Sequence, residues 1–386
     1  QIGLPQLPQV ASSSYFEIMR QWLIDCDHNH PKCRRSSARD LPTRLIYVGT
    51  LVNPSLSLYE TQPRDNMRYS ALSHPWGKPP HFCTFPSTID NHKKGIDFYD
   101  LPLTFRNAIT VTRELNLQYL WIDSICIIQG PDGDFENEAT RMEAVFSNAY
   151  CVLAACSVLG QGDSFLNERK KRKNISLKYE GKPAIFVCEF MDNFNQDVLE
   201  SNLSQRGWVL QERALARRTI YFTDKQTYWE CGGGVRCETM ARMDNTLASF
   251  LGDPNFPKVA IESSRGGKIL FHQSLCKQYS RLAFTRQTDR PVAISGLEKR
   301  LVQSFGVSGG YGVLNDTKNP GMLRRSMLWH RASDCTTLRR ISFARSAPPT
   351  WSCMSYEGPI DYPDLPFAQV EWEQCDIQSQ FLESGT

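Results

Sequence analysis

Two apolar runs with a helical segment between them constrain the fold of this chain more than any other feature. Tyr69–Leu72 and Tyr119–Asp123 are short, apolar and bounded by polar residues, which predicts two strands. Between them, Leu103–Leu115 has apolar residues at helical spacing, with Thr104 as the expected cap. Strands that are apolar on both faces need helices on both sides, as in parallel sheets. The pattern therefore predicts a strand–helix–strand unit, for which a right-handed crossover is the rule.

The same alternation continues further along the chain. Glu136–Ser147 predicts a second helix and Tyr150–Cys156 a third strand, which we expect beside the first two. Leu203–Leu215 predicts another helix, and two aromatic strands, Thr219–Thr223 and Thr227–Cys231, follow it. We therefore expect an α/β fold in which a mainly parallel sheet is flanked by helices.

The composition excludes several classes of protein. The net charge of +3 over 386 residues is too small to indicate nucleic-acid binding. The sequence has no unbroken apolar run of about 18 residues, as a membrane span would need, and no signal-peptide pattern at its start. The thirteen cysteines are an odd number without the spacing of a secreted scaffold, so we expect reduced thiols and a cytoplasmic protein.

The first helix is predicted over Tyr15–Cys26. The segment from the end of this helix to Cys33 contains four potential metal ligands. These are Cys26, His28, His30 and Cys33, within eight residues. Structural zinc sites usually combine two separated pairs of ligands, and no second pair is apparent in the sequence. Two interpretations stay open: a zinc site, or a helix end with packed cysteine and histidine side chains.

Polar side chains follow two of the predicted strands where each strand ends. Ser73-His74-Pro75-Trp76-Gly77 follows the first strand, and Asp123-Ser124 follows the second. Because the carboxyl ends of parallel strands meet at one edge of a sheet, these groups are expected to converge there on a ligand. An Asp at a strand end is also a common cap, so a purely structural role is the alternative. Cys126 could act as a nucleophile together with His74 and Asp123, but its apolar neighbours favour a buried structural thiol.

A third segment adds a carboxylate beside an aromatic ring. Trp208 and Glu212 are four residues apart, so on a helix they share one face. An aromatic ring lowers the local polarity around a carboxylate and can tune its acidity. In the alternative interpretation Trp208 lies in the core and Glu212 pairs with Arg213 or Arg206.

Taken together, these segments resemble the fungal heterokaryon-incompatibility (HET) domain family. The stretches that carry the resemblance are Tyr69–Gly77, Leu101–Ile109 with Tyr119–Gln129, Asp134–Met142, and Leu203–Arg213 followed by Tyr228-Trp-Glu-Cys231. The resemblance implies three parts of the chain. Residues 1–68 are an N-terminal helix and strand extension, 69–231 the HET domain, and 232–386 a C-terminal helical region with a β-rich tail packed on the core.

HET domains are also remotely similar to Toll/interleukin-receptor (TIR) domains, which implies a flavodoxin-like core for residues 69–231. Enzymatic TIR domains cleave the nicotinamide–ribose bond of NAD with a glutamate on a helix. In plant members this glutamate lies in a Trp-Cys-Leu-x-Glu string, and Trp208-Val-Leu-Gln-Glu212 has the same spacing. On this resemblance the expected catalytic residues are Glu212, His74 and Asp123, and the expected substrate-binding residues are Ser73, Trp76, Gly77, Ser124, Gln129, Arg206, Trp208 and Arg213.

The resemblance implies a small-molecule substrate, with NAD as the first choice and no bound cofactor required. Two alternatives stay open. A stand-alone enzyme of fungal secondary metabolism would use the same pocket as a cofactor-independent cyclase or isomerase. A non-catalytic module for incompatibility and cell-death signalling would act by forming a homo-oligomer. Neither alternative involves nucleic acid or a membrane.

Overall fold

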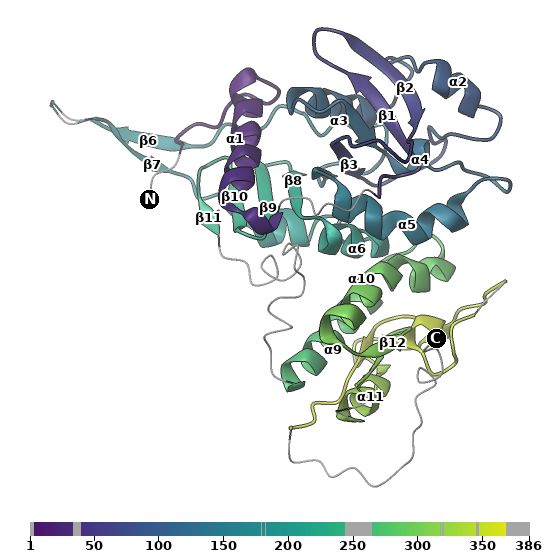
Figure 1. The fold of residues 1–386 in the computed structure, drawn as a ribbon. Coiled ribbons are helices and arrows are strands. Elements are labelled where there is room, and N and C mark those ends of the chain that lie inside the picture. Colours follow the sequence, from purple (N-terminus) through teal and green to yellow (C-terminus); the bar gives the residue numbers. More distant parts are fainter. Residues whose placement is uncertain are drawn as a thin grey trace. The chain divides into compact units, whose positions relative to one another are not determined.

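The computed structural model describes residues 4–367, apart from 34–39, 179, 182, 244–264, 317, 319 and 345–346 (Figure 1). The chain divides into two compact units. The first comprises Gln1–Gln205 and Glu212–Pro254, and the second Arg206–Gln211 and Asn255–Thr386. Among the described residues, none of the helices combines the length and the apolar character that crossing a bilayer requires.

A nine-stranded sheet forms the centre of the first unit. In spatial order its strands are β11 (Arg242–Met243), β10 (Gly234–Cys237), β9 (Thr227–Cys231), β8 (Arg218–Phe222), β5 (Cys151–Ala155), β3 (Tyr69–Ser73), β4 (Tyr119–Trp121), β1 (Arg44–Gly49) and β2 (Pro54–Glu60). A separate hairpin pairs β6 (Asn174–Leu177) with β7 (Ile185–Cys188).

The four central strands are parallel and the outer ones are not. β3 pairs in parallel with β4 and with β5, and β5 pairs in parallel with β8. The three predicted strands are therefore parallel neighbours, which confirms that part of the prediction. All other pairs of the sheet are antiparallel. The expectation of a mainly parallel sheet was wrong for the sheet as a whole, because β1 to β2 and β8 to β11 follow one another through antiparallel hairpins rather than through crossover helices.

Helices cover both faces of the parallel strands. The hydroxyl of Tyr69 donates to the carbonyl of Val145 on α5 (Phe135–Asn148) at 2.6 Å, and that of Ser70 contacts the hydroxyl of Thr112 on α3 (Leu103–Glu114) at 2.7 Å. Successive residues of a strand point to opposite faces, so α5 and α3 lie on opposite sides of the sheet. Thr104 was expected to be the cap of α3, and this prediction was wrong, because the cap is Pro102. The hydroxyl of Thr104 donates instead to the carbonyls of Gly160 and Asp163.

Further helices complete the first unit. They are α1 (Ser13–Asn29), α2 (Ile89–Lys94), α4 (Asp123–Cys126) and α6 (Gly207–Leu215), with a 3-10 turn at Pro31–Cys33 and a π-helical turn at Asn195–Leu199; α6 begins within the residues assigned to the second unit. The hydroxyl of Ser12 caps α1 by accepting from the N–H of Tyr15. Trp22 of α1 packs against Trp229 of β9, with ring centroids 6.3 Å apart, so α1 lies against this strand.

The second unit is mainly helical. Its helices are α9 (Arg265–Ser280), α10 (Arg290–Phe305) and α11 (Pro320–Met327), with a 3-10 turn at Gln287–Asp289 and another at Cys353–Ser355. Short two-stranded ladders pair β12 (Ser308–Gly310) with β13 (Val313–Asn315), β14 (His330–Arg331) with β17 (Ile360–Asp361), and β15 (Arg339–Arg340) with β16 (Tyr356–Glu357). Glu298 of α10 is buried and accepts the backbone N–H groups of Tyr311 and Gly312, which holds the turn between β12 and β13.

Burial raises the pKa of Glu298 to about 7, against the pull of its two N–H donors. Because the folded state holds this proton more tightly than the unfolded chain, stability should fall as the pH rises from about 4.5 to about 7, by up to about 3 kcal/mol. Glu298→Gln removes the titration and should flatten the decline. The test is the thermal midpoint of both proteins between about pH 5 and pH 8; parallel curves would contradict the prediction.

Candidate functional site

The carboxyl end of β3 meets a carboxylate from α6. Ser73, the last residue of β3, donates its hydroxyl to the Oε2 atom of Glu212 at 2.5 Å. Ser73 is buried, whereas Glu212 is half-buried, so the carboxylate lies at the border of the core. A charge-assisted hydrogen bond of this kind fixes the orientation of the carboxylate.

A second carboxylate lies beside the same loop. The indole N–H of Trp76 donates to Asp123 Oδ2 at 2.6 Å, and His74 Nδ1 lies 3.9 Å from Asp123 Oδ1. Asp123 also accepts the backbone N–H of Ser124 at 2.8 Å. The ring of His74 is buried and packs edge-on against Phe105 of α3. Residues 73–76 thus contact both Glu212 and Asp123.

Gly77 allows this loop to pass close to another segment. Its φ is +78°, and a Cβ atom there would lie 2.6 Å from the Cα atom of Gly160. The loop is tied to the same segment by the N–H of Gln161, which donates to the carbonyl of Trp76. A residue without a side chain is therefore required at position 77.

Ser124 and Gln129 are connected through Thr84. The N–H of Thr84 donates to the carbonyl of Ser124, and the N–H of Gln129 donates to the carbonyl of Thr84. The side-chain amide of Gln129 donates to the carbonyl of Ile127. The Ser124 hydroxyl is buried and has no hydrogen-bond partner in the described part of the chain.

The surroundings of Arg213 and Cys126 favour structural roles for both side chains. Arg213 forms an ion pair with Glu230 at 2.8 Å and also donates to the hydroxyl of Tyr221. This network supports a structural role, and the substrate-binding role expected for Arg213 stays a prediction. Burial raises the pKa of the Cys126 thiol to about 12, which favours the structural interpretation of this cysteine over a nucleophile.

Two further predicted binding residues belong to the second unit. The indole N–H of Trp208 donates to Asp289 at 3.4 Å, and Arg206 forms an isolated bridge with Ala283. The partner of Trp208 comes from the start of α10, about eighty residues further along the chain. A role for Trp208 and Arg206 in substrate binding stays a prediction.

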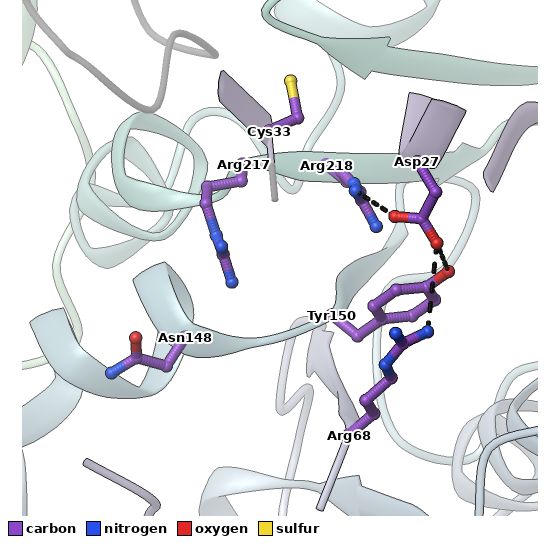
Figure 2. A pocket seen from close by; sticks show the side chains of 7 residues that line it. All are labelled: Asp27, Cys33, Arg68, Asn148, Tyr150, Arg217 and Arg218. Atoms are coloured by element: carbon purple, nitrogen blue, oxygen red, sulfur yellow. Dashed lines mark hydrogen bonds and ion pairs between the residues drawn. The ribbon is translucent and has the colours of Figure 1, made fainter. Parts of the chain in front are cut away.

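A cavity of about 310 Å³ lies at the opposite end of the parallel strands (Figure 2). Its lining residues are Asp27, Cys33, Arg68, Asn148, Tyr150, Arg217 and Arg218. Arg68 and Arg218 each lie 4.9 Å from the centroid of the Tyr150 ring, and Asp27 accepts hydrogen bonds from Arg218 and Tyr150. This cavity was not predicted from the sequence; the residues that indicate it are the basic or polar ones directly before β3, β5 and β8.

Comparison with known proteins identifies the segment that carries β3, α3, β4, α5 and β5. Residues 69–212 match the model of the heterokaryon incompatibility protein (HET) family. This segment is therefore similar to HET domains, and the match does not extend to the residues before or after it. Neither the search of curated proteins nor that of solved structures gave a significant match. The matched residues of the HET domain run from the first residue of β3 to Glu212, and so include both partners of the hydrogen bond at the carboxyl end of β3.

The candidate metal ligands lie outside the matched residues of the HET domain. Cys26, His30 and Cys33 come together with Cys231, the last residue of β9, whereas His28 is not part of this group. His28 is exposed, and its Nδ1 atom bonds to the carbonyl of Ile24. Cys231 was missed as a ligand because it lies 201 residues after His30.

Replacement of Gly77 tests whether its close approach holds the loop of the HET domain. We expect Gly77→Ala to cost about 1–3 kcal/mol, because the alanine Cβ is strained at this φ and clashes with the backbone of Gly160. Gly162→Ala is the matched control, since nothing lies within 4 Å of a Cβ there. Thermal unfolding of both variants measures the difference; equal midpoints for the two would contradict the prediction.

Proposed function

We propose that this HET domain hydrolyses the nicotinamide–ribose bond of NAD, with Glu212 as the carboxylate that faces the ribose. The observation that carries the proposal is the hydrogen bond from Ser73 to Glu212 at the carboxyl end of β3. It holds a carboxylate at a defined position, on the border of the core, at the edge of the sheet where parallel α/β folds bind their ligands.

The order of the parallel strands supports a TIR-like core. Numbered along the chain, β3, β4, β5 and β8 are the first to fourth parallel strands, and their spatial order is 2-1-3-4. Flavodoxin-like folds have this order, and their ligands bind at the switch point between the first and third strands. In this chain that point lies between β3 and β5, at the end of β3 that carries Ser73.

The proposed reaction depends on an ionised carboxylate beside the ribose rather than on an acid that protonates the leaving group. Nicotinamide leaves as a neutral group, so positive charge develops on the ribose as the bond breaks. A fixed carboxylate stabilises this charge electrostatically, as in glycosidases. Water then adds to the ribose and loses a proton, which gives ADP-ribose, nicotinamide and one proton from NAD and water.

The remaining groups of the loop would orient the substrate. Trp76, held by Asp123, offers an aromatic surface for the nicotinamide ring. The buried Ser124 hydroxyl can donate to a ribose or phosphate oxygen. His74, near Asp123, would help to position the ribose hydroxyls. A small-molecule substrate suffices for this chemistry, without a further cofactor.

Replacement of Glu212 tests the proposal directly. We expect Glu212→Ala and Glu212→Gln to lower the rate of NAD hydrolysis by about 100-fold or more, because the charge on the ribose is no longer stabilised. The measurement is nicotinamide and ADP-ribose released from NAD by purified protein, separated by chromatography.

Glu168→Gln is the control, since Glu168 is exposed and should keep the wild-type rate. Circular dichroism and the thermal midpoint establish that each variant is folded. Turnover by folded Glu212→Ala at the wild-type rate would refute the role of Glu212. No turnover by the wild type at high protein concentration would refute NAD hydrolysis and leave the cyclase and signalling hypotheses.

A further inference from the structure

Four potential metal ligands meet where α1 ends against the sheet. The Sγ atoms of Cys26, Cys33 and Cys231 and a ring nitrogen of His30 all lie within 4.8 Å of one another. All three cysteines are buried, and none of them is in a disulfide. Three thiols and one imidazole in such proximity are a donor set typical of structural zinc.

The spacing of these atoms fits a tetrahedral ion. With Zn–S bonds of about 2.3 Å and a Zn–N bond of about 2.0 Å, a tetrahedron places its ligand atoms roughly 3.5–3.8 Å apart. The Nδ1 atom of His30 lies 3.4 Å from the Sγ atom of Cys231. Binding therefore requires only small side-chain adjustments rather than movement of the backbone.

The local backbone presents three of the ligands from one short segment. Cys26 lies in the last turn of α1, and His30 caps the helix by donating its N–H to the carbonyl of Cys26. The 3-10 turn that follows brings Cys33 back, with its N–H on the carbonyl of His30 at 2.9 Å. A helix end with an immediate tight turn thus gathers all three ligand side chains on one side.

The fourth ligand comes from the hairpin between β9 and β10, and glycine is needed there. The N–H of Gly233 donates to the Sγ atom of Cys231 at 3.3 Å, a bond that favours a metal-bound thiolate. A Cβ atom at Gly233 would lie 2.2 Å from the Cε1 atom of His30. The turn therefore brings its backbone against the imidazole, and any side chain at position 233 would displace His30.

We propose that Cys26, His30, Cys33 and Cys231 bind a structural zinc ion that joins the N-terminal helix to β9. Four protein ligands complete a tetrahedron and leave no open position for a substrate, so the site is structural rather than catalytic. The ion would add to the packing of Trp22 on Trp229, which already joins the same two elements. This proposal is independent of NAD hydrolysis, because none of the four ligands belongs to the segment of Ser73 or Glu212.

The test is the metal content of the full chain, purified under reducing conditions. We expect about one zinc ion per chain by mass spectrometry of the metal, and Co²⁺ exchanged into the site should give the absorption of a tetrahedral thiolate complex. Removal of zinc with a chelator should lower the thermal midpoint, and zinc added back should restore it.

The zinc content of variants distinguishes the four proposed ligands from nearby residues that do not bind the ion. Cys231→Ser and Cys33→Ser should lose zinc, and Gly233→Ala should bind it less well; His28→Ala should retain it, because His28 is exposed and bonds to Ile24. If a ligand variant fails to fold, the Co²⁺ spectrum of the wild type still decides. Four results would overturn the proposal. Two concern the metal: wild-type protein without zinc after reconstitution, or an octahedral Co²⁺ spectrum. The others are a disulfide between two of the cysteines under these reducing conditions, or equal zinc loss in His28→Ala and Cys231→Ser.

Discussion

The burial of β3 is the constraint on which the architecture of the first unit depends. All five of its residues are buried, and it pairs in parallel on both edges. Its side chains alternate between α5 and α3, as Tyr69 and Ser70 do, so both faces are covered. No position within the strand is open to a ligand, and polar chemistry is therefore confined to its two ends.

Those two ends carry opposite charge. The carboxyl end of β3 meets Glu212, and the loop beyond it meets Asp123. The amino end opens into the cavity lined by Arg68, Arg217 and Arg218, where Asp27 forms ion pairs with Arg218 at 2.6 Å and with Arg68 at 3.9 Å. A carboxylate end favours developing positive charge and an arginine-lined end favours anions. The direction of the strands thus separates the two environments across the sheet.

The central strands are predictable because their signal is local: short apolar runs with helices between them. The local sequence does not show whether a strand runs parallel or antiparallel to its neighbour. β8 and β9 are buried throughout, which looks the same in parallel and antiparallel sheets, and only their short connection indicates a hairpin. The candidate site needs contacts over still longer separations. Ser73 meets Glu212 across 139 residues, and His30 meets Cys231 across 201, so neither contact can be derived from a local pattern.

These separations also show that the matched HET segment does not form its sheet alone. Of the nine strands, residues 69–212 contribute only β3, β4 and β5. Without the later residues, β5 would lose its partner β8 and expose a buried, apolar edge. β8 in turn is tied to α1, since Arg218 donates to Asp27 at 2.6 Å, one residue after Cys26 of the proposed zinc site. The helix α1 before the HET match and the strands β8 to β11 after it are therefore part of the same compact unit as β3, and the metal would stabilise the sheet that holds Ser73 and Glu212 in place.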